Sequence, residues 1–226
     1  MCGRFTLFAT YADLLDYLEA EQAIPENEYA PHYNIAPTQS ILAVINDGSK
    51  NRLGYLKWGL IPEWARDDQM AAKLMNARAE TIHEKPSFKD SFRTKRCLIP
   101  MNGYYEWTQA YGEKAPVYVL SEQHQILLAA GIWASWTSPE GKKVFTCSIL
   151  TQQASAEVSS IHHRMPVFVS KQHMQDWLNP TVTSVSHLRE ILNQSLTSGL
   201  HFHRVGTDVN SPKHDHPHLI KQIEAS

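Results

Sequence analysis

Short apolar runs rich in β-branched and aromatic residues follow one another along most of the chain, a pattern typical of strands. The most distinct runs occupy residues 96–100, 103–107, 115–120, 126–136 and 143–151. Turns are expected between them at 111–116 and 138–143, where glycine, proline and charged residues gather. These runs predict a largely antiparallel sheet.

Further strands are expected towards both ends of the chain. The segment 3–8 reads as a short strand, and the runs 40–47 and 52–58 on either side of an Asp-Gly turn predict a β-hairpin. The run 201–206 is expected to form the last strand. The segment 24–39 contains three prolines and is expected to be a loop.

Four segments are expected to be helical and to lie outside the sheet. The first follows Thr10, a residue type that caps helices. The second is a basic segment at 80–95, with Pro86 near a boundary or kink. The last two are 171–178 and 185–194.

No internal repeat or low-complexity linker interrupts the 226 residues, a length that fits one large domain or two small ones. The order of strands and helices favours the first of these. We therefore predict one α+β domain over residues 1–226, with a curved, mostly antiparallel, barrel-like sheet core and peripheral helices.

Composition and cysteine usage indicate a protein of the reducing cytosol. The longest apolar stretch, 126–136, is about half of the roughly 20 residues that a membrane span needs. The first residues lack the apolar region of a secretory signal. The three cysteines are far apart and odd in number, which favours neither a disulfide framework nor a zinc site.

Charge is unevenly distributed although the formal net charge is only −2. Residues 1–49 carry one basic and seven acidic side chains, whereas residues 50–96 carry eleven basic and six acidic ones. A local basic surface for phosphates would fit this distribution. A solvated face of mixed charge fits it equally well.

The thiol at position 2 offers unusual chemistry if Met1 is removed, because Cys2 then becomes a 1,2-aminothiol. An α-amino group has a pKa of about 7.7–8.0, so it is neutral far more often than a lysine amine at neutral pH. It can attack an aldehyde to form an imine, and the adjacent thiol can then close a five-membered thiazolidine. A small residue without a role remains the ordinary alternative.

Three other clusters carry polar or titratable groups. In LMNARAET, extended geometry would place Asn76, Arg78 and Glu80 on one face of a strand. These side chains would either line a groove or form the solvent-exposed face of an edge strand. Glu106 stands between Tyr105 and Trp107, where a raised pKa and proton transfer would be expected unless strand alternation turns the carboxylate to solvent.

The third cluster is SSIHHRMPVFV, which offers two histidines and an arginine ahead of a proline. Histidine is the side chain best suited to pass protons near neutral pH. Adjacent histidines in a surface loop are the ordinary alternative.

Together these stretches resemble one known family. The segments MCGRF, NARAET, RCLIPMNGYYEW, IHHRMP and VNSPKHD occur in the order and approximate spacing of the SOS-response-associated peptidase family, from residue 2 to about residue 220. Members of that family crosslink themselves to abasic sites in single-stranded DNA. The resemblance implies an abasic-site sensor that shields damaged strands.

The family's catalytic roles are expected at four positions of this chain. Cys2 would be the nucleophile after Met1 removal, and Asn76 would position its amine or the sugar. Glu106 would transfer protons during imine formation and reversal. His162 would help to open the deoxyribose ring at O4′, with His163 in a variable position.

The same resemblance implies a DNA-binding surface. Phosphates would be held by arginines, and two further side chains would shape the strand near the lesion; the candidates are Arg4, Arg78 and Arg164, and Pro37 and Trp64. Phosphate contacts do not read sequence, so binding should be sequence-tolerant and should weaken as salt rises. No cofactor, metal, membrane or obligate protein partner is expected, and the protein should be a monomer, cytoplasmic and nucleoid-associated when bound to DNA.

Two other functions remain open at this stage. The family name also implies a peptidase activity, including self-removal of the leading methionine, so an N-terminal-nucleophile cysteine peptidase is the first alternative to the lyase-like Schiff-base chemistry. A non-catalytic single-strand binder is the second. The tail KHDHPHLI is richer in histidine than is usual for the family, and we interpret His214, His216 and His218 as exposed rather than as metal ligands.

Overall fold

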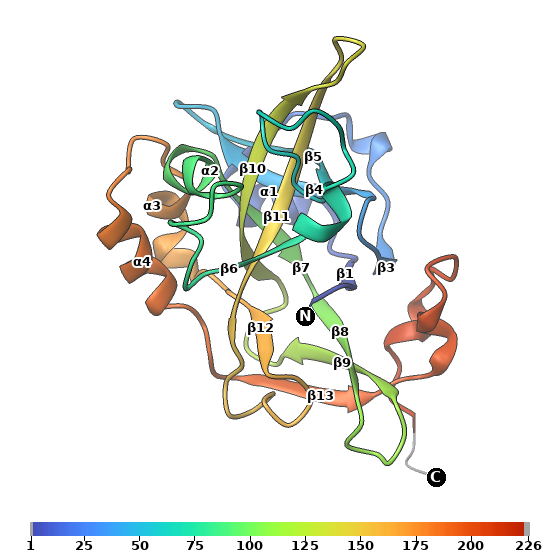
Figure 1. Cartoon of the computed structure of the whole chain (residues 1–226). Coiled ribbons are helices and arrows are strands. Elements are labelled where there is room, and N and C mark those ends of the chain that lie inside the picture. Colours follow the sequence, from blue (N-terminus) through green and yellow to red (C-terminus); the bar gives the residue numbers. More distant parts are fainter. Residues whose placement is uncertain (1, 224–226) are drawn as a thin grey trace.

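A closed β-barrel of five strands forms the centre of the protein (Figure 1). The computed structural model describes residues 2–223. The barrel strands are β4 (Ser40–Asn46), β5 (Asn51–Trp58), β7 (Arg96–Met101), β10 (Leu127–Thr137) and β11 (Lys143–Gln153). They pair in the order β11–β10–β7–β4–β5 through antiparallel contacts, and a parallel contact between β5 and β11 closes the ring. The expectation of a barrel-like, mostly antiparallel core is confirmed.

Three short strands extend the barrel sheet. They are β2 (Ala20–Gln22), β6 (Asn76–Arg78) and β12 (Arg164–Pro166). Strand β2 pairs with β5, whereas β6 and β12 both pair with the C-terminal half of β11. The register places Thr151 of β11 opposite Arg78 on one side and opposite Pro166 on the other. Two segments almost ninety residues apart in sequence are thereby held together beside one strand.

A second antiparallel sheet packs beside the barrel and carries the start of the chain. Its strands, in spatial order, are β13 (Leu200–Arg204), β9 (Ala115–Ser121), β8 (Gly103–Thr108), β1 (Phe5–Leu7) and β3 (His32–Ile35). One residue, Asn102, joins β7 of the barrel to β8 of this sheet. Its Oδ1 accepts hydrogen bonds from Phe8 N at 2.7 Å and Ala9 N at 3.2 Å. The link between the sheets therefore also holds the chain beyond β1.

The helices are short and lie at the periphery, as expected (Figure 1). They are α1 (Tyr11–Tyr17), α2 (Lys89–Thr94), α3 (Met174–Leu178) and α4 (Val185–Asn193), with 3-10 turns at Glu26–Glu28, Ala71–Leu74, Lys171–His173, Thr207–Asn210 and Pro217–Ile220. Asp13 N donates to Thr10 Oγ1 at 3.1 Å, which confirms the predicted cap of α1. Within residues 2–223, no helix has the length and apolar composition needed to cross a bilayer.

Three expectations about local structure were wrong or incomplete. The predicted loop 24–39 contains β3, because its residues find ladder partners in β1. The segment 80–95 forms mostly turns and becomes helical only at α2, since Pro86 has no N–H to continue a helix across it. Strand β12 was not expected; it exists because β11 runs past the barrel and offers it an edge.

A buried arginine joins α2 to the segment after α3. The Arg96 side chain is 2% exposed, and burial lowers its pKa to about 10. Its guanidinium donates to five backbone carbonyls: Trp177 at 2.6 Å, Phe92 at 3.0 Å, Arg93 at 2.5 Å, Asn179 at 2.5 Å and Val182 at 3.0 Å. Arg96 therefore holds α2, the end of α3 and the segment after α3 together.

Candidate functional site

Cys2 lies in the main hydrophobic core, immediately before β1. Its side chain is 0% exposed. Strand β1 pairs with β8 through Phe5 opposite Tyr104, and Tyr105 N donates to Arg4 O at 2.9 Å. The antiparallel register therefore directs Cys2 along β8 towards the Glu106 end of that strand.

Asn76, at the start of β6, holds the Cys2 backbone. Its Nδ2 donates to Cys2 O at 2.8 Å. Its Oδ1 is buried and has no hydrogen-bond partner among residues 2–223. The Asn76 amide therefore binds the Cys2 carbonyl through Nδ2 and keeps Oδ1 available as an acceptor.

Glu106 and Tyr104 occupy the same face of β8, because strand residues alternate. Glu106 is 5% exposed, so the alternative that it points into solvent is wrong. Burial, and secondly the charge of Glu106, raise the pKa of the Cys2 thiol well above its usual range. Burial, followed by the charges of Cys2 and Glu106, raises the pKa of Tyr104 in the same way. The three side chains therefore form one buried electrostatic cluster.

His162 is anchored by the backbone two residues further along. Arg164 N donates to His162 Nδ1 at 2.9 Å, and Arg164 O lies 3.0 Å from the same nitrogen. The amide suits a neutral ring that carries its proton on Nε2, and the carbonyl suits an imidazolium with Nδ1–H. The backbone of Arg164 can therefore orient the ring in either protonation state.

His163 stacks on His162 with 4.4 Å between ring centroids. The pKa of His163 is lowered, first by the charge of His162 and to smaller extents by burial and by the charges of Arg164 and Arg78. Arg78 is exposed at the end of β6, and its guanidinium forms no hydrogen bond or ion pair with another described residue. It is the predicted phosphate ligand whose guanidinium is available beside the His162 loop.

The Arg164 side chain is engaged within the protein. It forms a bidentate pair with Glu80, with Nη1–Oε1 at 2.6 Å and Nη2–Oε2 at 2.9 Å, and its Nη2 donates to Thr151 O at 2.6 Å. The hydrogen bond from Arg164 is the main cause of the lowered pKa of Glu80. These contacts fix the end of the His162 loop, the segment between β11 and β12, against β11 and against the turn after β6. A phosphate contact by Arg164 stays a prediction.

Arg4 is engaged in a similar way, with the C-terminal segment. Its Nη1 donates to Asn34 Oδ1 and to Val209 O, both at 2.7 Å. The guanidinium lies 5.7 Å from the ring centroid of Trp107. Asn34 Nδ2 donates in turn to His214 O at 2.8 Å. Arg4 thus ties the start of the chain to the VNSPKHD segment, and its proposed phosphate contact is untested.

Pro37 and Trp64 lie in loops around the barrel strands. Pro37 is partly buried between β3 and β4, directly before Thr38, which has a positive φ of 73°. Trp64 follows β5 and is 58% exposed, the most exposed large apolar side chain of residues 2–223. Their roles in shaping a DNA strand stay predictions.

The basic segment 50–96 does not form a uniform positive face. Two of its cations pair with acids of the first 49 residues across β4, β5 and β2, and two pair with acids in the loop after β5; the pairs are Lys50–Glu21, Arg52–Glu21, Arg52–Asp47, Lys57–Asp68 and Lys95–Glu63. Folding therefore pairs four of the eleven cations of this segment with carboxylates, two of them with acids of the first 49 residues.

His214 and His218 are exposed, as expected, whereas His216 is partly buried, and the tail contacts neighbouring segments. His32 Nδ1 and Asp215 Oδ2 are 2.5 Å apart, and His214 Nδ1 lies 2.9 Å from Asp208 O. Within residues 2–223, no group of three or more His, Cys, Asp and Glu side chains is arranged to hold a metal ion.

Sequence reasoning missed three supporting residues. Tyr104 had a usable signal, because alternation puts it on the Glu106 face of the same strand. Glu80 was noted as one of three polar residues that line a groove or face solvent, but its ion pair gave no signal, since its partner Arg164 is 84 positions away. Asn34, which connects Arg4 to the C-terminal segment, stood in a predicted loop and gave no signal.

Comparisons with known proteins agree with this fold and with the family that the sequence resembles. The chain matches the family model described as SOS response associated peptidase (SRAP) over residues 1–212. It is 42% identical over 222 residues to the abasic site processing protein YoqW of Bacillus subtilis (strain 168), covering 98% of this chain and 99% of that protein. It is 30% identical over 265 residues to the abasic site processing protein HMCES of Gallus gallus, covering 99% of this chain and 78% of that one.

A crystal structure of a protein from Bacteroides thetaiotaomicron superposes with a TM-score of 0.88 and 25% identity, covering 99% of this chain and 100% of that one. The fold, the sequence match over nearly the whole chain and the two relatives lead to one conclusion. The chain belongs to the SOS response associated peptidase (SRAP) family.

Proposed function

We propose that this protein captures abasic sites in single-stranded DNA by forming a thiazolidine with Cys2 once Met1 has been removed. The observation that carries the proposal is the convergence on Cys2: Asn76 holds its carbonyl at 2.8 Å, and Glu106 and Tyr104 share its buried environment. The two relatives are named abasic site processing proteins, which supports abasic DNA as the substrate class. Met1 itself lies outside the described residues.

The proposed reaction balances without a cofactor. The Cys2 amine adds to the aldehyde of the opened sugar, and loss of one water gives an imine. The thiol then adds across the C=N bond, so that sulfur bonds to carbon and the S–H proton ends on nitrogen. Burial raises the pKa of the thiol, which favours the protonated S–H form before this step. The buried Oδ1 of Asn76 offers an acceptor for the freed amine.

Glu106 is the proposed proton carrier of these steps. An ammonium must lose a proton before it can attack, and the hydroxyl of the carbinolamine must gain one to leave as water. Glu106 shares the buried cluster with Cys2, so one carboxylate serves both transfers. The reverse reaction needs the same transfers in the opposite order.

His162 is proposed to act earlier, on the closed sugar. An abasic sugar exists mostly as a cyclic hemiacetal, so the ring oxygen O4′ must be protonated for the aldehyde to appear. The Arg164 backbone offers a partner for the neutral ring and another for the charged ring. A histidine held in both states is suited to donate a proton and to recover it.

The proposal is tested with purified protein whose intact mass shows that Met1 is absent. Mixed with a single strand bearing one abasic site, it should give a heat-stable species in a denaturing gel. A strand with a tetrahydrofuran analogue, which has no aldehyde, should give none. Peptide mapping should place the added sugar on the N-terminal peptide. Absence of the adduct with the aldehyde strand, or its location elsewhere, contradicts the proposal.

His162→Ala is expected to slow adduct formation by about 100-fold while DNA affinity stays near that of the wild type, since a proton donor is lost and no phosphate ligand is removed. Rates come from single-turnover gels, and affinity from fluorescence anisotropy with the tetrahydrofuran strand. His163→Ala, which removes the stacked neighbour, is the matched control and should react at close to the normal rate. Loss of affinity in His162→Ala would instead assign His162 to binding.

A further inference from the structure

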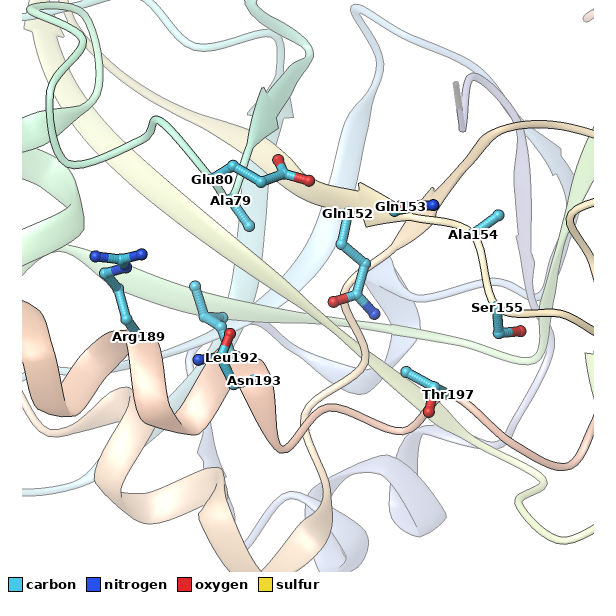
Figure 2. A pocket seen from close by; sticks show the side chains of 10 residues that line it. All are labelled: Ala79, Glu80, Gln152, Gln153, Ala154, Ser155, Arg189, Leu192, Asn193 and Thr197. Carbon is cyan, nitrogen blue, oxygen red and sulfur yellow. The ribbon is translucent and has the colours of Figure 1, made fainter.

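A pocket of about 400 Å³ lies between α4 and the ends of β6 and β11 (Figure 2). Arg189 and Asn193 project from α4 along one side, and Glu80 lies on the opposite side. Ser155 lies at the end of the pocket farthest from Arg189 in this view. The volume is within the range of pockets that hold small ligands, about 300–1,000 Å³.

The pocket adjoins the candidate site. Its wall includes Gln153 and Ala154, which also line a neighbouring hollow together with His163 and Arg164. The Glu80–Arg164 ion pair joins the two, because Glu80 lines the pocket and Arg164 lines the neighbouring hollow. A strand whose abasic sugar lies at Cys2 and His162 has this pocket beside it.

The charge of the pocket suits a phosphate at one end. Glu80 contributes no free negative charge, because both of its oxygens pair with Arg164. The Arg189 side chain is exposed and makes no hydrogen bond or ion pair with another described residue. The carboxylate of its neighbour Glu190 is directed to His187 instead, with 3.6 Å between Glu190 Oε2 and His187 Nδ1. The uncompensated charge of the pocket is one guanidinium.

The remaining lining suits a nucleobase. The side-chain amides of Gln153 and Asn193 make no hydrogen bond with another residue of 2–223, and Ser155 Oγ is buried without a partner there. Ala154 and Leu192 supply apolar surface between these polar groups. Amides pair with base edges, and apolar surface packs against a base face.

We propose that this pocket is a subsite for one nucleotide flanking the abasic one, with Arg189 on its phosphate and Gln153 and Asn193 on its base. The proposal rests on the proposed function. It adds that capture is helped by a neighbouring nucleotide held on the α4 side of the site. The abasic sugar itself offers no base to hold.

The test measures binding separately from capture. Anisotropy with tetrahydrofuran strands, which cannot form an adduct, reports affinity for three placements of the analogue: internal, at the 5′ end and at the 3′ end. Arg189→Ala should weaken binding of the internal strand about three- to tenfold and lower the salt slope by about 0.7, the share of one phosphate contact on a single strand. The loss should vanish on the one end-placed strand that lacks the pocket's nucleotide.

Two further variants sharpen the result. Asn193→Ala should weaken binding of the same strands without changing the salt slope, because it removes a base contact and no phosphate contact. Lys142→Ala is the matched control: it removes an exposed, unpaired cation from the turn of the β10–β11 hairpin, far from α4 (Figure 1). It should leave all three affinities unchanged.

Wild-type affinity of Arg189→Ala for the internal strand overturns the inference, and so does an equal loss on all three placements. Both leave the proposed function intact as long as the wild type forms its adduct with an aldehyde strand. Conversely, absence of that adduct defeats the proposed function, whereas the analogue strands still report on the pocket.

Discussion

Cys2→Ser, with Met1 removed, is expected to bind an abasic single strand with near-normal affinity and to leave no heat-stable adduct. The serine amine can still form an imine, but the hydroxyl can close only the oxygen analogue of the ring. The imine and that ring both return to the free aldehyde in water. Complete loss of the denaturation-resistant band, with unchanged anisotropy on the tetrahydrofuran strand, is the expected result.

The chain supplies its own controls for this experiment. Cys97 and Cys147 are the other thiols, and each is 0% exposed in a barrel strand. Cys97→Ala and Cys147→Ala should both keep the adduct, because neither thiol adjoins an α-amine. A band of wild-type intensity in Cys2→Ser, or its loss in Cys97→Ala, would contradict the assignment of sulfur capture to Cys2.

The pH dependence of capture provides a second measure of the same step. Burial, and then the charge of Glu106, raise the pKa of the Cys2 thiol, so deprotonation of this thiol is shifted to higher pH. Capture should therefore accelerate only as the α-amine loses its proton, at a pKa of about 7.7–8.0, and should show no further rise at the ordinary thiol pKa of about 8.5. A pH profile that requires this second ionisation would mean that a thiolate is the attacking species.

The strands could be predicted from sequence wherever they carry their own apolar and aromatic residues. The barrel strands and β8 and β9 lie within a few residues of their predicted ranges. The missed strands, β2, β3 and β12, are edge segments with few such residues, and each depends on a ladder partner distant in sequence. Local pattern contains no information about that partner.

The candidate site, too, could be predicted only in part. Cys2 and His162 were found because their side-chain chemistry is unusual at any position, and the resemblance to a family assigned them roles. The roles of the arginines were harder to predict, since sequence does not show whether a guanidinium faces solvent or pairs within the protein. Arg164 pairs with Glu80, and Arg4 pairs with Asn34 and Val209 O, partners that only the tertiary fold brings near. Arg78 is the predicted phosphate ligand that this structure leaves available.

The burial of Arg96 also could not be predicted, because the residue stands at the start of an apolar strand and its sequence context gave no sign of it. This residue matters for the stability of the fold. Arg96→Met is expected to lower the free energy of unfolding by about 2–4 kcal/mol. Methionine replaces the aliphatic stem, but five carbonyl oxygens lose the guanidinium as a donor at the junction of α2 and the segment after α3. Urea unfolding followed by circular dichroism measures the change.

Two further variants complete the experiment: a control at another arginine, and one that separates the hydrogen bonds of Arg96 from its charge. Arg93→Met removes an exposed arginine from α2 and should change stability by no more than about 0.5 kcal/mol. Arg96→Lys keeps the charge but has a compact ammonium in place of the fork, so it reaches fewer of the five carbonyls and should fall between the wild type and Arg96→Met. If Arg96→Lys equals the wild type, charge alone suffices; if Arg96→Met equals it, the carbonyls do not depend on this donor.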